Sequence, residues 1–106
     1  MKIIAVYTTV GSREVARAIA ESLVRRGLAA CAQISQIESF YAWNGTIENE
    51  AEFRVLLKTV EARYDAVDAA IRELHPYELP AIHAVAFERV YPPYAQWIGD
   101  NSCSER

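Results

Sequence analysis

The dipeptide Asn44-Gly45 restricts the fold of this sequence more than any other feature, because both residues tolerate the positive φ of a two-residue hairpin turn. On either side of it lie two segments, residues 28–43 and 46–59, each long enough for an extended strand. The sequence therefore predicts an antiparallel pair of long strands joined by a tight turn.

The turn also predicts the pairing of these strands, with Trp43 opposite Thr46 and, if no bulge intervenes, Cys31 opposite Lys58. Successive side chains point to opposite faces, so one face is polar and aromatic while the other is apolar and suited to helices. The first face carries Gln33, Ser35, Ser39, Tyr41 and Trp43 with Glu48, Glu50, Glu52, Arg54 and Lys58. The second carries Ile34, Phe40, Ile47, Ala51, Phe53, Val55 and Leu57.

The other segments predict two helices and two further strands. Residues 3–10 form an unbroken apolar and β-branched run, which is typical of a strand covered on both faces. A helix is expected from Ser12, a favourable N-cap, to Gly27, which can close it in a left-handed conformation. A second helix is expected over residues 61–74, because Pro76 disfavours helical geometry in the residue before it.

Residues 81–90 predict a fourth strand, and a short terminal helix is expected to start at Tyr91. The order β-α-β-β-α-β with a C-terminal helix predicts an α+β fold of ferredoxin-like topology. Right-handed crossovers are expected to bring the first and fourth strands to the centre of the sheet, which agrees with their apolar sequences.

Composition supports a single domain over residues 1–106, with a polar tail expected to fray over residues 101–106. Hydrophobic residues make up 52% of the chain, and Cys31 and Cys103 make no disulfide framework, so a reducing compartment is favoured. The net charge is −3 with scattered basic residues, which argues against nucleic acid as a partner. The N-terminal apolar run is too short for a signal peptide or a membrane span, so we expect a cytoplasmic protein.

The length of the hairpin predicts an oligomer. Strands of about thirteen residues span on the order of 40 Å, at roughly 3.3 Å per residue. A compact domain of this size has a diameter of roughly 34 Å, so part of the hairpin should project beyond its own core. Its tip carries Tyr41 and Trp43, which are costly to expose, and a neighbouring subunit is the simplest cover. A bent hairpin and a partly wet sheet are the alternative.

Five ordered segments carry a family resemblance: Ala29-Ala30-Cys31, Tyr41-Ala42-Trp43-Asn44-Gly45, Glu50 through Leu57-Lys58-Thr59, His75-Pro76-Tyr77-Glu78-Leu79-Pro80 and Tyr94-Ala95-Gln96-Trp97. At these spacings the chain resembles the CutA divalent-cation tolerance family from Ile4 to about Trp97. The resemblance implies a ferredoxin-like fold assembled as a tight homotrimer, with architectural kinship to the PII nitrogen-signalling proteins. It also implies a non-enzymatic role in tolerance to divalent cations, copper especially.

By motif position, the resemblance implies a ligand cleft between subunits. The residues that match are Cys31, Tyr41, Trp43, Glu50, Lys58, Tyr77, Glu78 and Trp97, with His75 as the candidate metal ligand. Tyr7 and Leu74 stand where some relatives have a cysteine and a histidine, and the loss of two soft ligands argues against a preformed copper site. We therefore expect no required cofactor, with weakly bound copper(II) or another divalent cation as the alternative.

Each of these residues also has a structural interpretation. The aromatic side chains suit subunit packing as well as ligand stacking. His75, at a helix end, suits a hydrogen-bonding role. Glu50 and Lys58 predict an acid–base pair in a cleft, whereas Glu48, Glu52 and Arg54 equally predict a surface ion network.

Two rival functions remain open. A PII-like sensor or adaptor would bind a small molecule and dock to an unknown target protein. A hydrolase would use Lys58 and Glu50, but the chain has no nucleophile elbow and no phosphate-binding loop. Residues 9–13 only faintly resemble the arginine-bearing phosphate loop of acylphosphatase, which has a similar size and topology.

Overall fold

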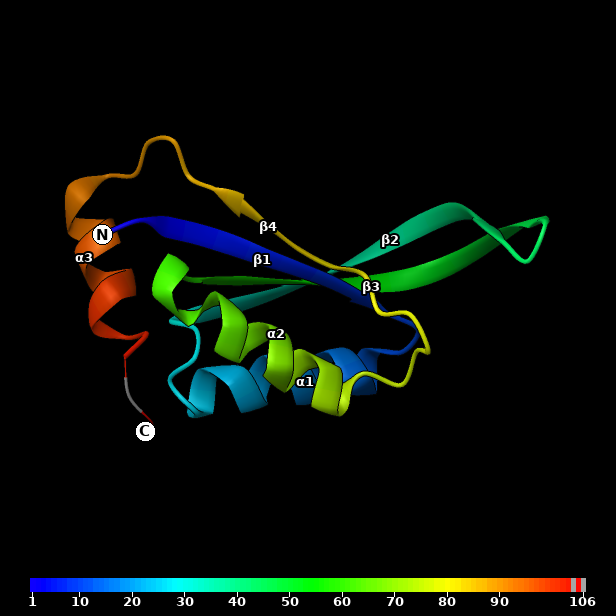
Figure 1. The fold of residues 1–106 in the computed structure, drawn as a ribbon, viewed down its shortest axis with the longest axis horizontal. Coiled ribbons are helices and arrows are strands. Elements are labelled where there is room, and N and C mark those ends of the chain that lie inside the picture. Colours follow the sequence, from blue (N-terminus) through cyan, green and yellow to red (C-terminus); the bar gives the residue numbers. More distant parts are fainter. Residues whose placement is uncertain (104, 106) are drawn as a thin grey trace.

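The computed structural model describes residues 1–103 and 105, and these form an α+β fold (Figure 1). A four-stranded antiparallel sheet in the order β2-β3-β1-β4 carries helices α1 and α2 on one face. The elements are β1 (Ile3–Val10), α1 (Arg13–Arg25), β2 (Cys31–Trp43), β3 (Thr46–Val60), the short 3-10 helix η1 (Glu61–Arg63), α2 (Tyr64–Leu74), β4 (Ile82–Ala86) and α3 (Pro92–Asp100).

The hairpin register agrees with the sequence prediction along its whole length. Trp43 lies opposite Thr46 and Cys31 lies opposite Lys58, with no bulge between these pairs. The turn residues Asn44 and Gly45 have φ values of 50° and 79°. The expected two-residue turn therefore sets which side chains share a face over both long strands.

The predicted position of the fourth strand is wrong. β4 pairs only with β1 and lies at an edge, whereas β3 lies between β1 and β2. The crossover through α1 leaves room for one strand beside β1, and β3 fills it because the tight turn keeps it against β2. β4 is also shorter than the predicted strand over residues 81–90. Its pairing stops near Phe87, whose N–H donates to the Ile3 carbonyl, because β1 begins at Ile3.

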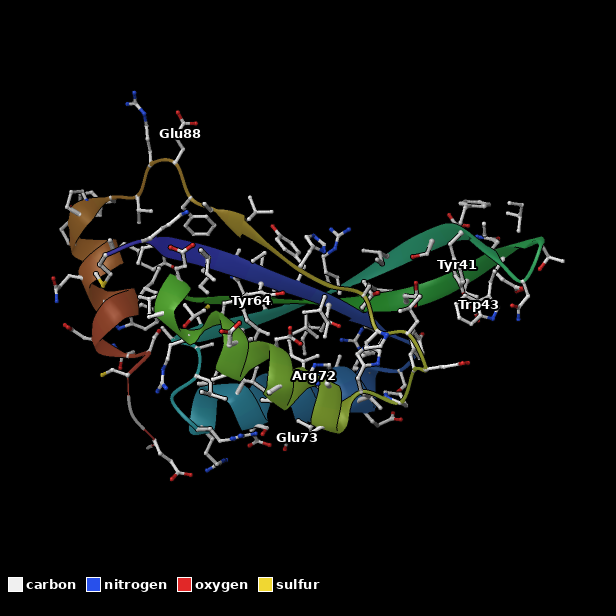
Figure 2. The ribbon with its side chains drawn as sticks, viewed as in Figure 1. Tyr41, Trp43, Tyr64, Arg72, Glu73 and Glu88 are labelled. Carbon is white, nitrogen blue, oxygen red and sulfur yellow. The ribbon has the colours of Figure 1, made fainter. Side chains whose placement is uncertain are left out.

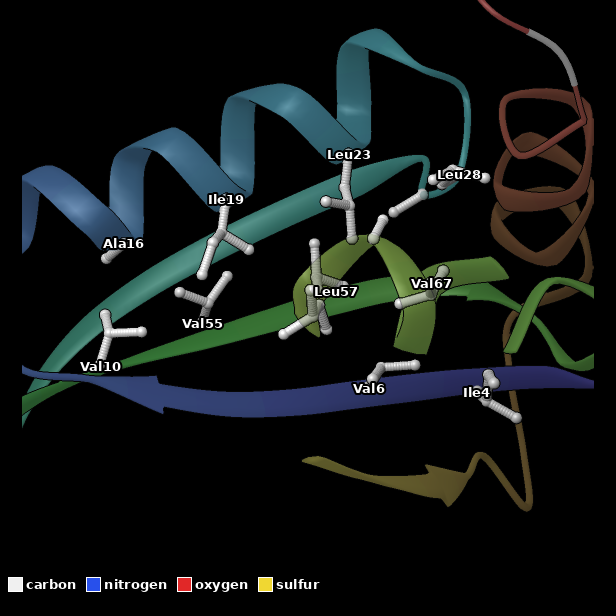
Figure 3. Close-up of a cluster of buried hydrophobic side chains, with 13 residues drawn as sticks. Ile4, Val6, Val10, Ala16, Ile19, Leu23, Leu28, Val55, Leu57 and Val67 are labelled. Carbon is white, nitrogen blue, oxygen red and sulfur yellow. The ribbon is translucent and has the colours of Figure 1, made fainter. Parts of the chain in front are cut away.

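The main core lies between the sheet and helices α1 and α2 (Figure 3). Ile19 and Leu23 of α1 pack against Val55 and Leu57 of β3, and all four side chains are fully buried. The hydroxyl oxygen of Ser12 accepts a hydrogen bond from the N–H of Val15, which confirms the predicted N-cap.

The C-terminal end of α1 also agrees with the prediction. Gly27 has a φ of 69°, a left-handed conformation that favours glycine, and the chain turns there into β2. His75 ends α2 in an extended conformation before Pro76.

The far ends of β2 and β3 project beyond the helices as an arm (residues 37–52), and the molecule measures 45 × 27 × 21 Å (Figure 1). At the opposite end, α3 packs on the sheet face that α1 and α2 leave uncovered. There Ile98 is buried with Ile3 and Ala30. We call the rest of this face, from the edge of α3 to the tip of the arm, the open face.

The polar tail predicted to fray over residues 101–106 includes Ser102, which packs against the rest of the chain. Ser102 is buried, its hydroxyl donates to the Ile98 carbonyl, and its own carbonyl accepts a hydrogen bond from Arg63. The remainder of that prediction falls partly on residues 104 and 106, which lie outside the described residues. Across the part of the chain that the structure describes, no helix is long and apolar enough to cross a membrane.

Candidate functional site

A pocket of about 960 Å³ lies where the arm leaves the body of the sheet. The arm supplies one wall, and the loop that follows α2 supplies the other. Its lining comprises Thr9, Ile37, Glu38, Ser39, Phe40, Tyr41, Ala42, Trp43, Glu50, Glu52, Arg54, Tyr77, Glu78, Leu79 and Ala81. We call this feature the arm pocket. Five of the candidate residues predicted from the sequence line it, namely Tyr41, Trp43, Glu50, Tyr77 and Glu78.

The hairpin register positions the arm side of this pocket. Tyr41 and Trp43 are two residues apart on β2 and therefore lie on the same face, as Figure 2 shows along the arm. The strand neighbour of Tyr41 is Glu48, and its diagonal neighbour is Glu50. The Tyr41 hydroxyl donates a hydrogen bond to Oε1 of Glu50. This bond raises the pKa of Tyr41 to about 12, because ionising the phenol removes the donated proton beside a carboxylate.

His75 positions the loop side of the pocket. Its Nδ1 accepts a hydrogen bond from the Tyr77 N–H at 3.2 Å, so its Nε2 carries the proton and donates to the Thr9 carbonyl at 2.8 Å. The imidazole is buried and packs edge-on against the Tyr77 ring, with centroids 4.8 Å apart. A β-carbon at Gly11 would lie 3.1 Å from the Tyr77 hydroxyl, so glycine leaves room for the ring.

The loop carries Tyr77 to a carboxylate on the sheet. The Tyr77 hydroxyl donates to Oε2 of Glu52 at 2.9 Å. Burial raises the pKa of Tyr77, and the hydrogen bond to Glu52 raises it further. Glu52 is only 6% exposed, so the prediction that it belongs to a surface ion network is wrong. Its burial depends on the loop that covers it, and the spacing of the hairpin gives no sign of that loop.

The other candidate residues form a second group near α3. The Lys58 ammonium donates to the Tyr94 hydroxyl at 3.0 Å, and the Tyr94 ring stacks on Trp97 with centroids 5.8 Å apart. Cys31, a half-buried free thiol, is the strand neighbour of Lys58. The structure therefore separates the nine predicted residues into two groups at opposite ends of the open face, with His75 behind the arm pocket.

The predicted acid–base pair of Glu50 and Lys58 does not form within the chain. Both residues lie on β3 eight positions apart, which corresponds to about 26 Å along an extended strand. Glu50 instead accepts from Tyr41, and Lys58 donates to Tyr94. A shared strand face places two side chains on the same side of the sheet but does not bring them into contact.

The described residues do not form a chelating metal site. They contain no group of three or more His, Cys, Asp or Glu side chains placed to hold one ion. Both ring nitrogens of His75 are already hydrogen-bonded to the backbone. The ring of Tyr7 stacks on that of His83, with centroids 5.2 Å apart. The described residues of one chain therefore do not assemble a chelating site for a copper ion.

Comparison with known proteins places this geometry in a family. The family model of the CutA1 divalent ion tolerance protein matches residues 4–101. Protein CutA homolog of Xenopus laevis is 39% identical over 97 residues, which cover 91% of this chain and 64% of that protein. Divalent-cation tolerance protein CutA of Pyrococcus horikoshii is 37% identical over 95 residues, which cover 90% of this chain and 93% of that protein. The chain thus spans less than two thirds of the Xenopus protein and nearly all of the archaeal one.

Solved structures of CutA proteins have the same fold as this chain. CutA from Xylella fastidiosa is 31% identical with a TM-score of 0.93, and the match covers 97% of this chain and 100% of that one. The periplasmic divalent cation tolerance protein CutA from Archaeoglobus fulgidus is 34% identical with a TM-score of 0.92, over 94% of this chain and 98% of that one.

Proposed function

Because the chain belongs to the CutA1 divalent ion tolerance family, we propose that it acts in tolerance to divalent cations as a non-enzymatic cytoplasmic homotrimer of ferredoxin-like subunits. In this proposal the arm of each subunit packs on a neighbour. The arm pocket, closed by that neighbour, holds a cationic ligand. The element order and the strand order β2-β3-β1-β4 support the ferredoxin-like assignment.

The uncovered arm is the observation that carries the proposal. Phe40 is 69% exposed and Ile47 is 73% exposed on one side of the arm, and Trp43 is 40% exposed on the other. Apolar side chains on both sides of a projecting hairpin favour association when no other part of the chain covers them. An arm that contacts a different patch on its neighbour makes a heterologous contact, and such contacts form a ring such as a trimer when the rotation between subunits closes.

The charge of the arm pocket supports a cationic ligand. Three acidic residues from the polar face and the loop line it, Glu50, Glu52 and Glu78, and among the described residues Arg54 is the basic residue in its lining. One chain supplies no group of three metal ligands within its described residues, so in this proposal a direct site for copper(II) lies between subunits, where a neighbour adds donors. The roughly 26 Å between Glu50 and Lys58 along β3 supports the non-enzymatic assignment.

Native mass spectrometry of the metal-stripped protein tests the assembly. We expect a species of three times the 11.9 kDa mass of one chain. The double variant Trp43→Ser/Ile47→Ser should give monomers, because it removes apolar surface from both sides of the arm. Tyr91→Ser, which removes a 74% exposed aromatic side chain at the far end of the molecule, should remain trimeric. A monomeric wild-type protein would overturn the proposal.

The same samples test the metal part of the proposal. Titration with copper(II) and zinc should load the trimer and leave the monomeric arm variant empty, because the ligands then come from more than one subunit. Equal uptake by both species would show that one chain binds the metal alone. A trimer that takes up neither ion would remove direct metal binding from the proposal.

A further inference from the structure

The arm pocket contains a buried carboxylate whose charge no cation in the described chain balances. Glu52 is more than nine-tenths buried and lines the pocket. Its Oε2 accepts from the neutral phenol of Tyr77. Its Oε1 has no hydrogen-bond or ion-pair partner among the described residues and keeps some of the remaining accessibility of the side chain. Buried carboxylates are stable when a positive charge accompanies them, so this oxygen marks a place for a cation.

The basic side chain nearest in sequence does not serve this purpose. The guanidinium of Arg54 lies over the ring of Tyr7, 5.9 Å from its centroid, and makes no ion pair within the described part of the chain. The neighbouring carboxylate of Glu50 accepts from the Tyr41 hydroxyl and from no other group in the described residues. The pocket therefore combines two carboxylates that are hydrogen-bonded by neutral phenols.

Three aromatic residues share the pocket with these carboxylates. Tyr41, Trp43 and Tyr77 all line the pocket, and their faces attract positive charge. The volume of about 960 Å³ lies within the range typical of small-molecule sites. A bare metal ion needs several converging oxygen or nitrogen ligands, which the described residues do not assemble here. An organic cation needs only one or two carboxylates and an aromatic wall.

We infer that the arm pocket binds a small organic cation, a primary amine or a guanidinium on a short carbon chain. Its N–H groups donate to Oε1 of Glu52 and to the carboxylate of Glu50, and its carbon chain lies against the rings of Tyr41 and Trp43. This inference deepens the proposed function, because it rests on the same pocket and names the class of ligand.

Isothermal titration calorimetry of the assembled wild-type protein with 1,4-diaminobutane tests the inference. The diamine should bind, and 1,4-butanediol, which has the same carbon chain without charge, should not. Glu52→Gln should weaken diamine binding by at least about tenfold, because the variant removes the charge that faces the ligand. Glu61→Gln is the matched control. It removes the same charge from an exposed ion pair with Lys2 and should bind as the wild type does.

Glu50→Gln should also weaken binding. Because Glu50 is exposed, this variant is expected to fold, so it tests the ligand contact even if the Glu52 variant misfolds. Diamine binding that is unchanged in both variants, or absent from the wild-type protein, would overturn the inference. These outcomes are separate from the test of assembly. A trimer that ignores the diamine refutes only the ligand class, whereas a monomer that binds it refutes only the trimer.

Discussion

The base of the β2–β3 hairpin and its arm have the same register and the same alternation of side chains, yet their apolar residues have opposite surroundings. At the base, Val55 and Leu57 are fully buried beneath α1 and α2. In the arm, Phe40 and Ile47 lie on the same face of the same strands and are largely exposed. The difference lies in the cover, because α1 starts at Arg13 and neither helix extends over the arm (Figure 1). Alternation shows which face is apolar, whereas burial depends on what packs against it.

The largest contrast should come from matched truncations at the base and in the arm. Leu57→Ala leaves a cavity in the main core, so we expect the free energy of unfolding to fall by about 2–5 kcal/mol. Ile47→Ala should change the unfolding free energy of the isolated subunit by less than about 0.5 kcal/mol. Urea unfolding of both variants in a Phe40→Ser/Trp43→Ser background, which removes apolar surface from both sides of the arm and keeps Ile47, provides the comparison. Equal losses at the two positions would contradict it.

A smaller effect is expected from Arg63, which joins two helix ends near the base. Its guanidinium donates to the Ser102 carbonyl at 2.9 Å and to the Gly27 carbonyl at 3.3 Å. Arg63→Ala should lower the free energy of unfolding by about 1–3 kcal/mol, because both carbonyls lose a charged donor. Arg72→Ala is the matched control, since it breaks only an exposed ion pair with Asp68 and should cost about 0.3–0.5 kcal/mol. The two losses would be similar if the carbonyl contacts contribute nothing.

Substitution of Thr8, at the base of the sheet, should raise the free energy of unfolding, whereas the substitutions above lower it. Its hydroxyl is buried and has no hydrogen-bond partner within the described residues. Thr8→Val should therefore raise the free energy of unfolding by about 1 kcal/mol, because it removes an unsatisfied polar group at nearly constant shape. Thr59→Val should lower it by a similar amount, since Thr59 donates to the Leu28 carbonyl at 2.7 Å. Thermal unfolding monitored by circular dichroism measures both signs, and destabilisation by Thr8→Val would refute the prediction.

The smallest effect concerns alkaline pH at the arm. The pKa of Tyr41 is raised from 10.0 to about 12, so its neutral, hydrogen-bonded phenol stabilises the folded chain below about pH 10. That contribution is lost as the pH rises from about 10 through 12. The difference in stability between the wild type and Tyr41→Phe should therefore shrink over this interval, which urea unfolding at several pH values can follow. A constant difference would mean that the Tyr41–Glu50 hydrogen bond does not form in solution.

Much of the fold could be predicted because its signals are local. Asn44-Gly45 determined the turn and, through it, the pairing of Cys31 with Lys58 at the far end of the hairpin. Ser12 and Gly27 bound the first helix through side-chain capping and a left-handed backbone, and both act within a few residues. Only the arm side of the candidate site could be predicted in this way, because the shared face of Tyr41, Trp43 and Glu50 follows from the hairpin register and the alternation of side chains.

The sequence by itself determined the helices, the hairpin, its register and the two chemically different faces of the sheet. Only the tertiary structure decided that β3 rather than β4 is central, that Glu52 is buried beneath Tyr77, and that Glu50 and Lys58 lie apart. The physical reason is the sequence separation over which each signal acts. Turn geometry, capping and alternation act between neighbours in the chain, whereas the order of strands and the loop that covers Glu52 depend on segments that meet only after folding.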